Sequence, residues 1–143
     1  MTIEATEAEI IEEFELFDTW EEKYEYIIDM GKKLPPLDDA HKKEENIIKG
    51  CQSTVWLVAE EKDGQVFFKA DSEAIIVKGL VSMLIRVLSG HPPDEIINAQ
   101  LEFIDRIGMK NHLAQTRSNG LAAMVKQMKH YALAYKLKNT PGI

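Results

Sequence analysis

The sequence is poor in cysteine: Cys51 is the only one in 143 residues. A lone cysteine excludes an intramolecular disulfide, and with it every fold that depends on disulfides for stability. The chain also lacks an apolar run approaching the ~20 residues of a transmembrane helix. Residues 2–17 are acidic and show neither the basic nor the apolar region of a signal peptide. We therefore expect a protein of the reducing cytoplasm with no membrane partner.

Sequence motifs for resident metals and cofactors are absent as well. The chain has no P-loop, no G-x-G-x-x-G, no H-E-x-x-H and no paired-cysteine metal motif. Its four histidines show no zinc-binding spacing with Cys51, and one thiolate cannot hold an iron–sulfur cluster by itself. The sequence therefore predicts no metal site and no cofactor of its own.

The charge of the chain argues against another class of partner. The net charge is −7; residues 1–45 carry 15 acidic against 5 basic side chains, whereas residues 46–143 carry 9 against 12. An acidic chain without a basic stripe is a poor ligand for nucleic acids or anionic membranes. The acidic first third is either a solvated helical face, which we favour, or a surface for a basic protein partner.

Apolar residues at helical spacing predict two helices near the N-terminus. The first is expected over Thr6–Phe17, with Thr6 as its N-cap. The second is expected to begin at Asp18 or Thr19 and to end at Gly31. The following Leu34-Pro35-Pro36-Leu37 cannot continue a helix and predicts an extended segment.

Three short runs predict a small antiparallel sheet. Ile47-Ile48 suits a short strand leading into the cysteine, and residues 54–60 alternate between apolar and polar side chains as a strand does. Asp63-Gly64 is typical of a two-residue hairpin turn, after which residues 66–70 return as a further strand. Gly50, immediately before the cysteine, suits a backbone position with positive φ.

Further helices are predicted after the sheet. The most apolar of them, from Asp71 or Ser72 to Gly90, is expected to be the central core helix. The others are expected over residues 93–100, over residues 101–108 and from a cap at Ser118 to Leu137. With no linker or repeat, the sequence predicts one α+β domain over residues 1–143, in which a small three-stranded antiparallel sheet packs against several helices.

Cys51 is the residue whose chemistry the sequence leaves open. It is either a buried, inert side chain or a nucleophile, and a nucleophile requires the thiolate form. A nearby cation would lower the pKa of the thiol. Arg117 and His112 could supply one if the fold brings their polar segment beside the cysteine. Arg117 could equally be a surface residue at the start of the last helix.

The segment Gly50-Cys51-Gln52-Ser53, followed by Val55-Trp56, resembles the cysteine-loop signature of the SufE family of sulfur acceptors, also called cysteine desulfuration proteins. The resemblance continues in the same order along residues 14–130. The other stretches that carry it are Trp20-Glu21-Glu22-Lys23-Tyr24 with Ile27-Ile28, Leu34-Pro35-Pro36-Leu37, Asp71-Ser72 with Ile76-Val77-Lys78-Gly79-Leu80, and His112-Leu113 with Thr116-Arg117-Ser118-Asn119-Gly120-Leu121 and Met124.

The resemblance implies a fold related to iron–sulfur scaffold (IscU-like) proteins and a function as a sulfur acceptor. Cys51 would take the persulfide sulfur of a Suf-type cysteine desulfurase, activate that enzyme, and pass the sulfur to an iron–sulfur cluster scaffold complex. The desulfurase, rather than this chain, would carry pyridoxal phosphate, so the chain would not be an enzyme on its own. Gly50, Gln52, Arg117 and His112 would support the cysteine.

A non-catalytic binding or regulatory module of the same fold, with a structural Cys51, is the alternative. A cysteine hydrolase is disfavoured because no general base stands at a recognisable spacing. Monomer and homodimer both remain open. A persulfide must be shielded from water and thiols, and Gly50 lies between the apolar pairs Ile47-Ile48 and Val55-Trp56. We therefore expect Cys51 to be protected in the free protein and exposed in the complex with the desulfurase.

Overall fold

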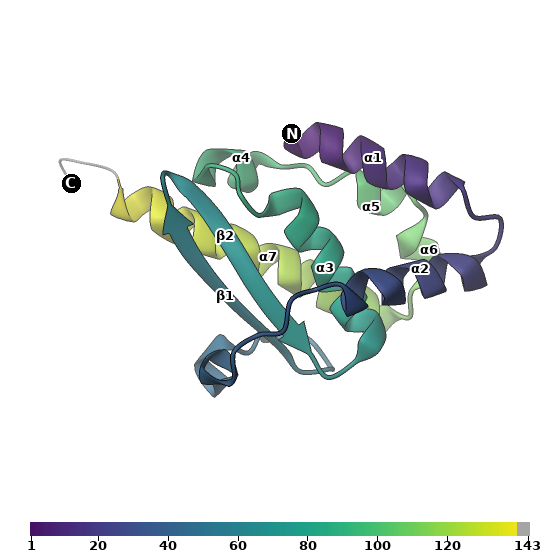
Figure 1. The fold of residues 1–143 in the computed structure, drawn as a ribbon, viewed down its shortest axis with the longest axis horizontal. Helices are drawn as coiled ribbons and strands as arrows, with labels where there is room; N and C mark the ends of the chain where they lie inside the picture. Colours follow the sequence, from purple (N-terminus) through teal and green to yellow (C-terminus); the bar gives the residue numbers. More distant parts are fainter. Residues whose placement is uncertain (140–143) are drawn as a thin grey trace.

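The structure, a computed structural model that describes residues 1–139, packs its helices against a two-stranded hairpin that lies along one side (Figure 1). The predicted domain also included residues 140–143, which lie outside the described residues. The strands β1 (Val55–Lys62) and β2 (Gln65–Ser72) pair antiparallel along their whole length. The helices are α1 (Ile3–Glu15), α2 (Trp20–Lys32), α3 (Ile75–Leu88), α4 (Pro93–Asn98), α5 (Phe103–Arg106), α6 (Met109–His112) and α7 (Gln115–Lys138), with short 3-10 turns η1 (Asp39–His41) and η2 (Glu44–Asn46).

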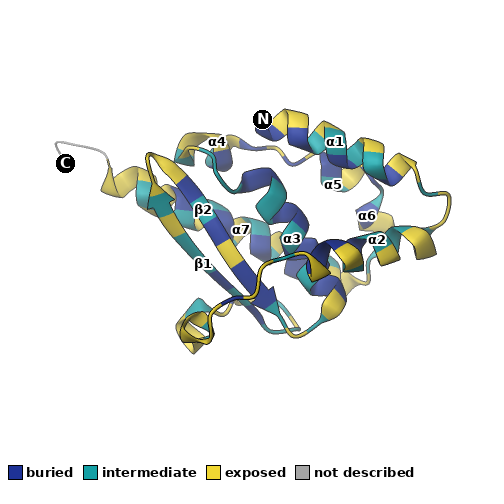
Figure 2. Cartoon of the chain, viewed as in Figure 1, coloured by how far each residue is buried: buried dark blue, intermediate teal, exposed yellow. Residues whose placement is uncertain are grey.

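α3 forms the centre of the core, as predicted. It contacts α1, α2, α7 and β2, and buried residues occupy most of its circumference (Figure 2). Apolar residues that recur all round a helix, rather than along one stripe, are the pattern of a helix enclosed by its neighbours. The first turn of α3 also reaches the cysteine segment, since Val77 and Cys51 line the same hollow.

The first two helices begin at threonine caps. Thr2 caps α1, because its Oγ1 accepts a hydrogen bond of 3.0 Å from the Ala5 N–H. The predicted cap was wrong: Thr6 lies inside the helix, where its hydroxyl donates to the Thr2 carbonyl at 3.1 Å. At α2 the prediction is confirmed, since Thr19 Oγ1 accepts from the Glu22 N–H at 3.2 Å.

α2 and α3 approach each other most closely at two glycines. A Cβ on Gly79 would lie 2.1 Å from the Ile27 carbonyl oxygen, and one on Gly31 would lie 2.7 Å from the Gly79 nitrogen. Gly31 was predicted to end α2, but the helix continues to Lys32. Both glycines are therefore packing residues, because backbones at this separation leave no space for a side chain.

Within residues 1–139 the sheet has two strands rather than the predicted three. The predicted turn at Asp63-Gly64 is confirmed, with φ of 54° and 79° at its two residues. Ile47-Ile48 forms only an isolated bridge, in which Ile47 lies opposite Trp56. The Ile48 N–H donates to the Val55 carbonyl at 2.9 Å, and the pairing ends there.

Side chains of α7 take the place of a third strand along β1. The hydroxyl of Tyr131 donates to the Leu57 carbonyl at 3.2 Å, and that of Tyr135 donates to the Ala59 carbonyl at 3.0 Å. These partners are 74 and 76 residues apart in the sequence, so local alternation could not reveal them. Because the two carbonyls are already paired, the edge of β1 does not need another strand.

α3 begins without a side-chain cap. β2 extends through Ser72 and the N-cap is Ala74, so neither Asp71 nor Ser72 caps the helix as predicted. Asp71 instead forms ion pairs with Lys42 at 3.3 Å and Lys78 at 3.2 Å. Burial acts to raise the pKa of Asp71, but the hydrogen bond from the Ser72 N–H and the two lysines outweigh it and leave the pKa below its ordinary value.

The C-terminal helices follow the predicted order with one addition. α4 opens at Pro93, and Gly108, with φ of 83°, separates α5 from the short α6 that the sequence did not predict. α7 begins at Gln115, before the predicted cap Ser118. Arg117 therefore lies in the first turn of this helix and not in a preceding loop.

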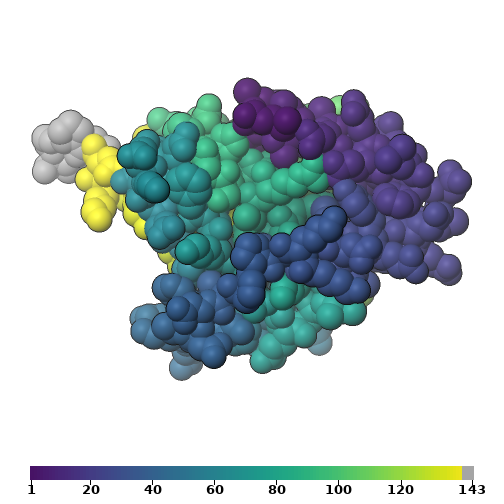
Figure 3. Space-filling model, viewed as in Figure 1, coloured from purple at the N-terminus to yellow at the C-terminus, as the bar shows by residue number. Residues whose placement is uncertain are grey.

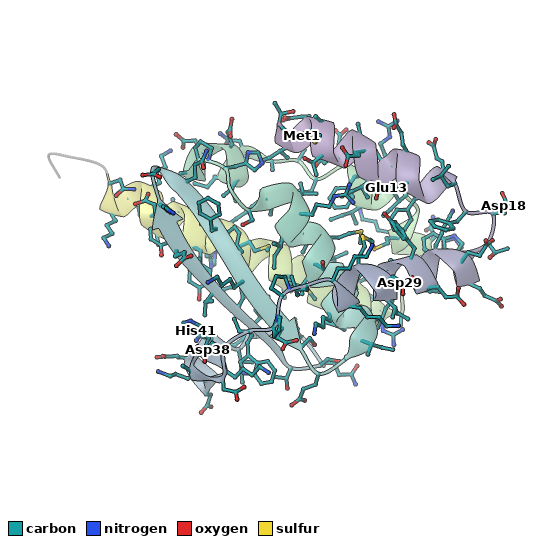
Figure 4. The ribbon with its side chains drawn as sticks, in the orientation of Figure 1. Met1, Glu13, Asp18, Asp29, Asp38 and His41 are labelled. Atoms are coloured by element: carbon teal, nitrogen blue, oxygen red, sulfur yellow. The ribbon has the colours of Figure 1, made fainter. Side chains whose placement is uncertain are left out.

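Arg86 links α3 to α1 through two carboxylates. Its guanidinium donates to the two oxygens of Glu13 at 2.8 and 2.6 Å and to Glu9 at 2.6 Å, and the Tyr26 hydroxyl also donates to Glu13. Figure 4 shows Glu13 on the side of α1 that faces α2. The hydrogen bonds from Arg86 are the main cause of the lowered pKa of Glu13. Burial, together with the bond to Glu13, raises the pKa of Tyr26 to about 12.

Replacing Arg86 with methionine is expected to lower the free energy of unfolding at neutral pH by about 2 kcal/mol, because the half-buried Glu13 loses its charged partner. The folded-state pKa of Glu13 lies below its unfolded value, so its contribution is complete above the unfolded pKa and is lost as the pH falls through the folded pKa. Urea unfolding across the acidic range should therefore show a smaller acid-induced loss in R86M than in the wild type. Arg106→Met, at an exposed arginine of α5, is the control, and equal losses at both positions would contradict this account.

Candidate functional site

The cysteine loop connects the bridge at Ile47-Ile48 to the start of β1 at Val55. Gly50 has φ of 93°, which confirms the predicted positive φ. A Cβ at this position would also lie 3.3 Å from the Ala123 Cβ of α7, closer than side-chain carbons normally approach. Conformation and space therefore both favour glycine at the position before Cys51.

Cys51 is half-buried and faces α7. Its Sγ lies 3.5 Å from the Gly120 carbonyl oxygen, a distance at which the thiol can donate a weak hydrogen bond. A Cβ on Gly120 would lie 3.6 Å from the same sulfur. The thiol therefore packs beside the helix backbone, at a distance that would also leave ordinary contact space for a Cβ at Gly120.

A hollow of about 240 Å³ opens beside the thiol. Its walls come from the cysteine loop, from the first turn of α3 and from the beginning of α7. Besides Cys51, Ala114 and Gly120, the lining residues are the polar Gln52, Ser53, Thr116 and Arg117 and the apolar Val77 and Met124. The thiol therefore lies where an apolar interior meets a polar rim.

The structure brings three of the predicted site residues to this hollow: Cys51, Gln52 and Arg117. Gln52 and Arg117 are exposed at its rim. Gly50 shapes the loop without lining the hollow. His112 lies outside it; its ring stacks on the Trp20 ring, with the two centroids 4.1 Å apart. Of the two candidate cations in this segment, only Arg117 reaches the hollow beside the cysteine.

Burial raises the pKa of the Cys51 thiol above its ordinary value. A reactive thiol would need a nearby cation to lower this pKa. In the described part of the chain, the influence on the pKa of Cys51 is burial, which raises it. Arg117 lines the hollow but is exposed, where solvent weakens its field. In the free protein the sulfur is therefore held as a thiol, its less nucleophilic form.

The rate of Cys51 alkylation by iodoacetamide is expected to rise with pH along a curve whose midpoint lies above that of the urea-unfolded chain. The same shift affects stability with a definite sign. Because the folded-state pKa is raised, the contribution of the neutral thiol is complete below the unfolded pKa and is lost as the pH rises through the folded pKa. A midpoint below that of the unfolded chain would show that cations or N–H donors outweigh burial.

Thr116, Gly120 and Met124 belong to the site although the sequence analysis did not assign them to it. A glycine inside a helix costs about 1 kcal/mol relative to alanine, and this cost is the signal that could have drawn attention to Gly120. Met124 is 1% exposed and so is also a core residue. Met124 also forms part of the wall of the hollow, because the cysteine loop, far away in the sequence, packs beside it.

Between residues 1 and 139, no group of three or more histidine, cysteine, aspartate or glutamate side chains is arranged to hold a metal ion. No helix in the same range is long and apolar enough to cross a membrane. At the hollow, Cys51 is the side chain that can form a covalent bond by nucleophilic attack. Arg117 is the cation that can pair with an anion held there.

Fold and site together define an α+β protein that presents one loop cysteine against a long C-terminal helix. The chain belongs to the SufE family: the family model, described as an Fe-S metabolism associated domain, matches residues 8–132. It is 36% identical over 129 residues to an uncharacterized SufE-like protein of Rhizobium meliloti, which covers 87% of this chain and 92% of that protein. An uncharacterized SufE-like protein of Synechocystis is 36% identical over 135 residues, which covers 94% of this chain and 85% of that protein.

A solved structure shares the fold. The solution structure of a hypothetical protein from Thermus thermophilus matches with a TM-score of 0.75 over 90% of this chain and 94% of that chain. The two sequences are 19% identical, so this likeness concerns the fold alone. The comparisons confirm the resemblance to the SufE family and the α+β class that the sequence predicted.

Proposed function

We propose that this chain is the sulfur acceptor and activator of a pyridoxal-phosphate-dependent cysteine desulfurase. Cys51 takes the persulfide sulfur of that enzyme and relays it to an iron–sulfur cluster scaffold complex in the cytoplasm. Membership of a family associated with Fe-S metabolism supports the pathway. The observation that carries the proposal is the half-buried thiol of Cys51 at the wall of a hollow of about 240 Å³, which has room for one more sulfur atom.

The transfer exchanges one sulfur–sulfur bond for another. Cys51 loses its proton, and the resulting thiolate attacks the outer sulfur of the cysteine persulfide on the enzyme. A bond forms between Cys51 Sγ and that sulfur, while the original sulfur–sulfur bond breaks. The enzyme's cysteine leaves as a thiolate and takes up a proton. A thiol and a persulfide have thus exchanged roles, so no external oxidant or reductant is required.

The lining of the hollow suits the product of this transfer. A sulfur atom added to Cys51 Sγ can extend over the apolar side chains of Val77 and Met124, which exclude water. Arg117 at the rim can pair with a persulfide anion, and Gln52 can donate a hydrogen bond to it. We propose these as supporting roles, whereas the position of His112 on Trp20 provides no support for a role at the sulfur.

Because Cys51 is half-buried against Gly120 and burial raises the pKa of its thiol, we propose that the loop changes its position before the thiol reacts. Docking of the desulfurase would draw the sulfur away from Gly120 and out of its half-buried position. The thiol would then be exposed to solvent and would ionise more readily. Gly50 is the residue at which the loop backbone can move, because glycine adopts its present φ of 93° and other φ values at little cost in free energy. The sulfur is then protected in the free protein and exposed in the complex.

Alkylation of Cys51 is expected to be at least about tenfold faster in the complex than in the free chain, since loss of one unit in pKa multiplies the thiolate fraction about tenfold. The partner should be a desulfurase whose own persulfide-forming cysteine is replaced by serine, so that transferred sulfur does not mask Cys51. Saturation is checked by analytical ultracentrifugation. Equal rates with the partner bound would contradict opening of the loop.

Activation of the desulfurase tests the proposed function directly. Adding this chain to a Suf-type desulfurase with free cysteine is expected to increase alanine release several-fold, because the acceptor clears the enzyme's persulfide. The chain whose Cys51 has been blocked by carboxymethylation in urea, and which is then diluted out of the urea, serves as the inactive control. An unchanged rate of alanine release at saturating concentrations of the folded chain would contradict the proposal.

A binding or regulatory module with a structural Cys51 is the second candidate function. The contact of Sγ with the Gly120 carbonyl and the raised pKa of the thiol favour it, because a buried, inert cysteine shows both features. This candidate predicts that binding and regulation of the desulfurase survive when Cys51 is replaced. Sulfur relay predicts that the replaced chain no longer activates the desulfurase.

A further inference from the structure

The first turn of α7 forms one wall of the hollow beside Cys51. Thr116 and Arg117 lie in this turn, and Ala114, the N-cap residue, precedes it. None of residues 115–119 is buried, and the N-cap makes no side-chain hydrogen bond to the helix. The first N–H groups of a helix have no partner within it, so a first turn without a cap or buried side chains unwinds easily. This wall of the hollow therefore needs support from another part of the chain.

Three hydrogen bonds that hold α7 to other elements lie farther along the helix. Tyr131 and Tyr135 donate to carbonyls of β1. Lys129 Nζ donates to the Ala99 carbonyl at 2.6 Å. Lys129 is the first of these residues in the sequence, and it lies roughly three helical turns beyond Arg117. These bonds therefore fix the far part of the helix and leave its first turn to other contacts.

The segment before α7 is held by α2. His112, the last residue of α6, stacks its ring on that of Trp20, with the centroids 4.1 Å apart and 17° between the planes. The Tyr24 hydroxyl donates to the His112 carbonyl. α6 lies beside α2 in Figure 1, and Figure 3 shows α1 and α2 at the surface on the right of the same view. One stacked pair and one hydrogen bond therefore join α2 to the residue at which α6 ends.

The connection from His112 to α7 is short. Leu113 and Ala114 alone separate them, and their ψ angles are 143° and 151°. Two residues of extended chain reach at most about 7 Å, so a fixed His112 restricts where α7 can begin. Gly108 allows the ring of Trp20 to come this close, since a Cβ there would lie 3.3 Å from Trp20 Cζ2. The packing of α2 on the turn before α6 therefore sets the start of α7.

We propose that Trp20 and Tyr24 are positioning residues for the hollow at Cys51. By holding His112, they keep the first turn of α7 wound and Arg117 at the rim. Neither of the two lines the hollow, so they act on it through the start of α7. This role rests on the proposed function in one respect, since sulfur relay gives Arg117 a persulfide anion to pair with. The test uses the free chain without a desulfurase, so the positioning role can fail while sulfur relay stands, and the reverse.

Hydrogen exchange of the Ser118 amide tests whether the first turn stays wound, because that N–H donates to the Ala114 carbonyl at 3.0 Å. Tyr24→Phe and Trp20→Leu are each expected to accelerate this exchange about fivefold in the ¹⁵N-labelled chain, the factor that one lost hydrogen bond allows. Tyr26→Phe is the matched control: this tyrosine is also on α2, but its hydroxyl donates to a carboxylate of α1. Unchanged exchange in either test variant, or equal acceleration in the control, would overturn the proposal.

Alkylation of Cys51 by two reagents tests whether Arg117 is held at the rim. Iodoacetate is an anion and iodoacetamide is neutral, so the ratio of their rates reports positive charge near the thiolate, whereas general loosening of the fold raises both rates together. Arg117→Ala is expected to lower this ratio about twofold, because solvent weakens the attraction between exposed charges. Tyr24→Phe and Trp20→Leu should lower it in the wild-type chain but not further in Arg117→Ala. An unchanged ratio in any of these single variants, or a further fall beyond that of Arg117→Ala, would overturn the proposal.

Discussion

Replacing Cys51 with serine is expected to abolish sulfur transfer to this chain and to return the desulfurase to the rate it has alone. A hydroxyl cannot hold the transferred sulfur as a persulfide, and its pKa lies far above that of a thiol, so it is not a nucleophile at neutral pH. The fold should survive, because serine has nearly the same shape as cysteine and its hydroxyl can donate to the Gly120 carbonyl that now accepts from Sγ. Transfer is measured with ³⁵S-cysteine as the source of sulfur.

A matched control comes from the same hollow. Ser53→Ala removes a hydroxyl from the lining without touching the sulfur, so transfer to Cys51 should persist. Unfolding temperatures of both variants should stay within a few degrees of the wild type. If Cys51→Ser still activates the desulfurase, the binding-module interpretation of Cys51 is correct and sulfur relay is wrong. Label on Cys51→Ser would equally contradict relay through this side chain.

Replacing Gly79 with alanine is expected to destabilise the protein by about 3 kcal/mol, near the upper end of what overpacking costs. The added Cβ would lie 2.1 Å from the Ile27 carbonyl oxygen and 2.6 Å from Ile27 Cγ2. The first of these is a backbone atom, so no change of side-chain rotamer can relieve the clash. α2 and α3 must separate, and the unfolding temperature should fall by roughly 10 °C.

Gly120→Ala is the matched control, since Gly120 also lies inside a long helix. Its new Cβ would meet Cys51 Sγ at 3.6 Å, which is an ordinary contact distance. Alanine also favours the helix by up to about 1 kcal/mol, so this variant should be as stable as the wild type or slightly more so. Similar losses in urea unfolding for the two variants would contradict the close crossing of α2 and α3.

Features that depend on a few neighbouring residues could be predicted from the sequence. The hairpin turn at Asp63-Gly64 and the cap at Thr19 are confirmed because their hydrogen bonds and dihedral angles are local. The positive φ at Gly50 is local in the same sense. The cap of α1 was misplaced because Thr2 and Thr6 are both suitable residues, and the packing of α1 on the core decides between them.

Features that depend on distant residues could not be predicted. The third strand was expected because Ile47-Ile48 is apolar and β-branched, but Tyr131 and Tyr135 satisfy the β1 carbonyls from the far end of the chain. The site shows the same division. Sequence identified Cys51 and Arg117 as candidates, whereas the contact between Cys51 and Gly120 spans 69 residues and could be seen only in the fold.

Mass spectrometry of the Cys51 peptide tests the central claim most directly. The folded chain is incubated with a Suf-type cysteine desulfurase and free cysteine, separated from the enzyme, and digested without reductant. The account predicts a gain of one sulfur atom on that peptide, removed by a reductant and absent when the enzyme or cysteine is left out. A peptide that stays unmodified while the desulfurase is active and the two proteins are bound would contradict it.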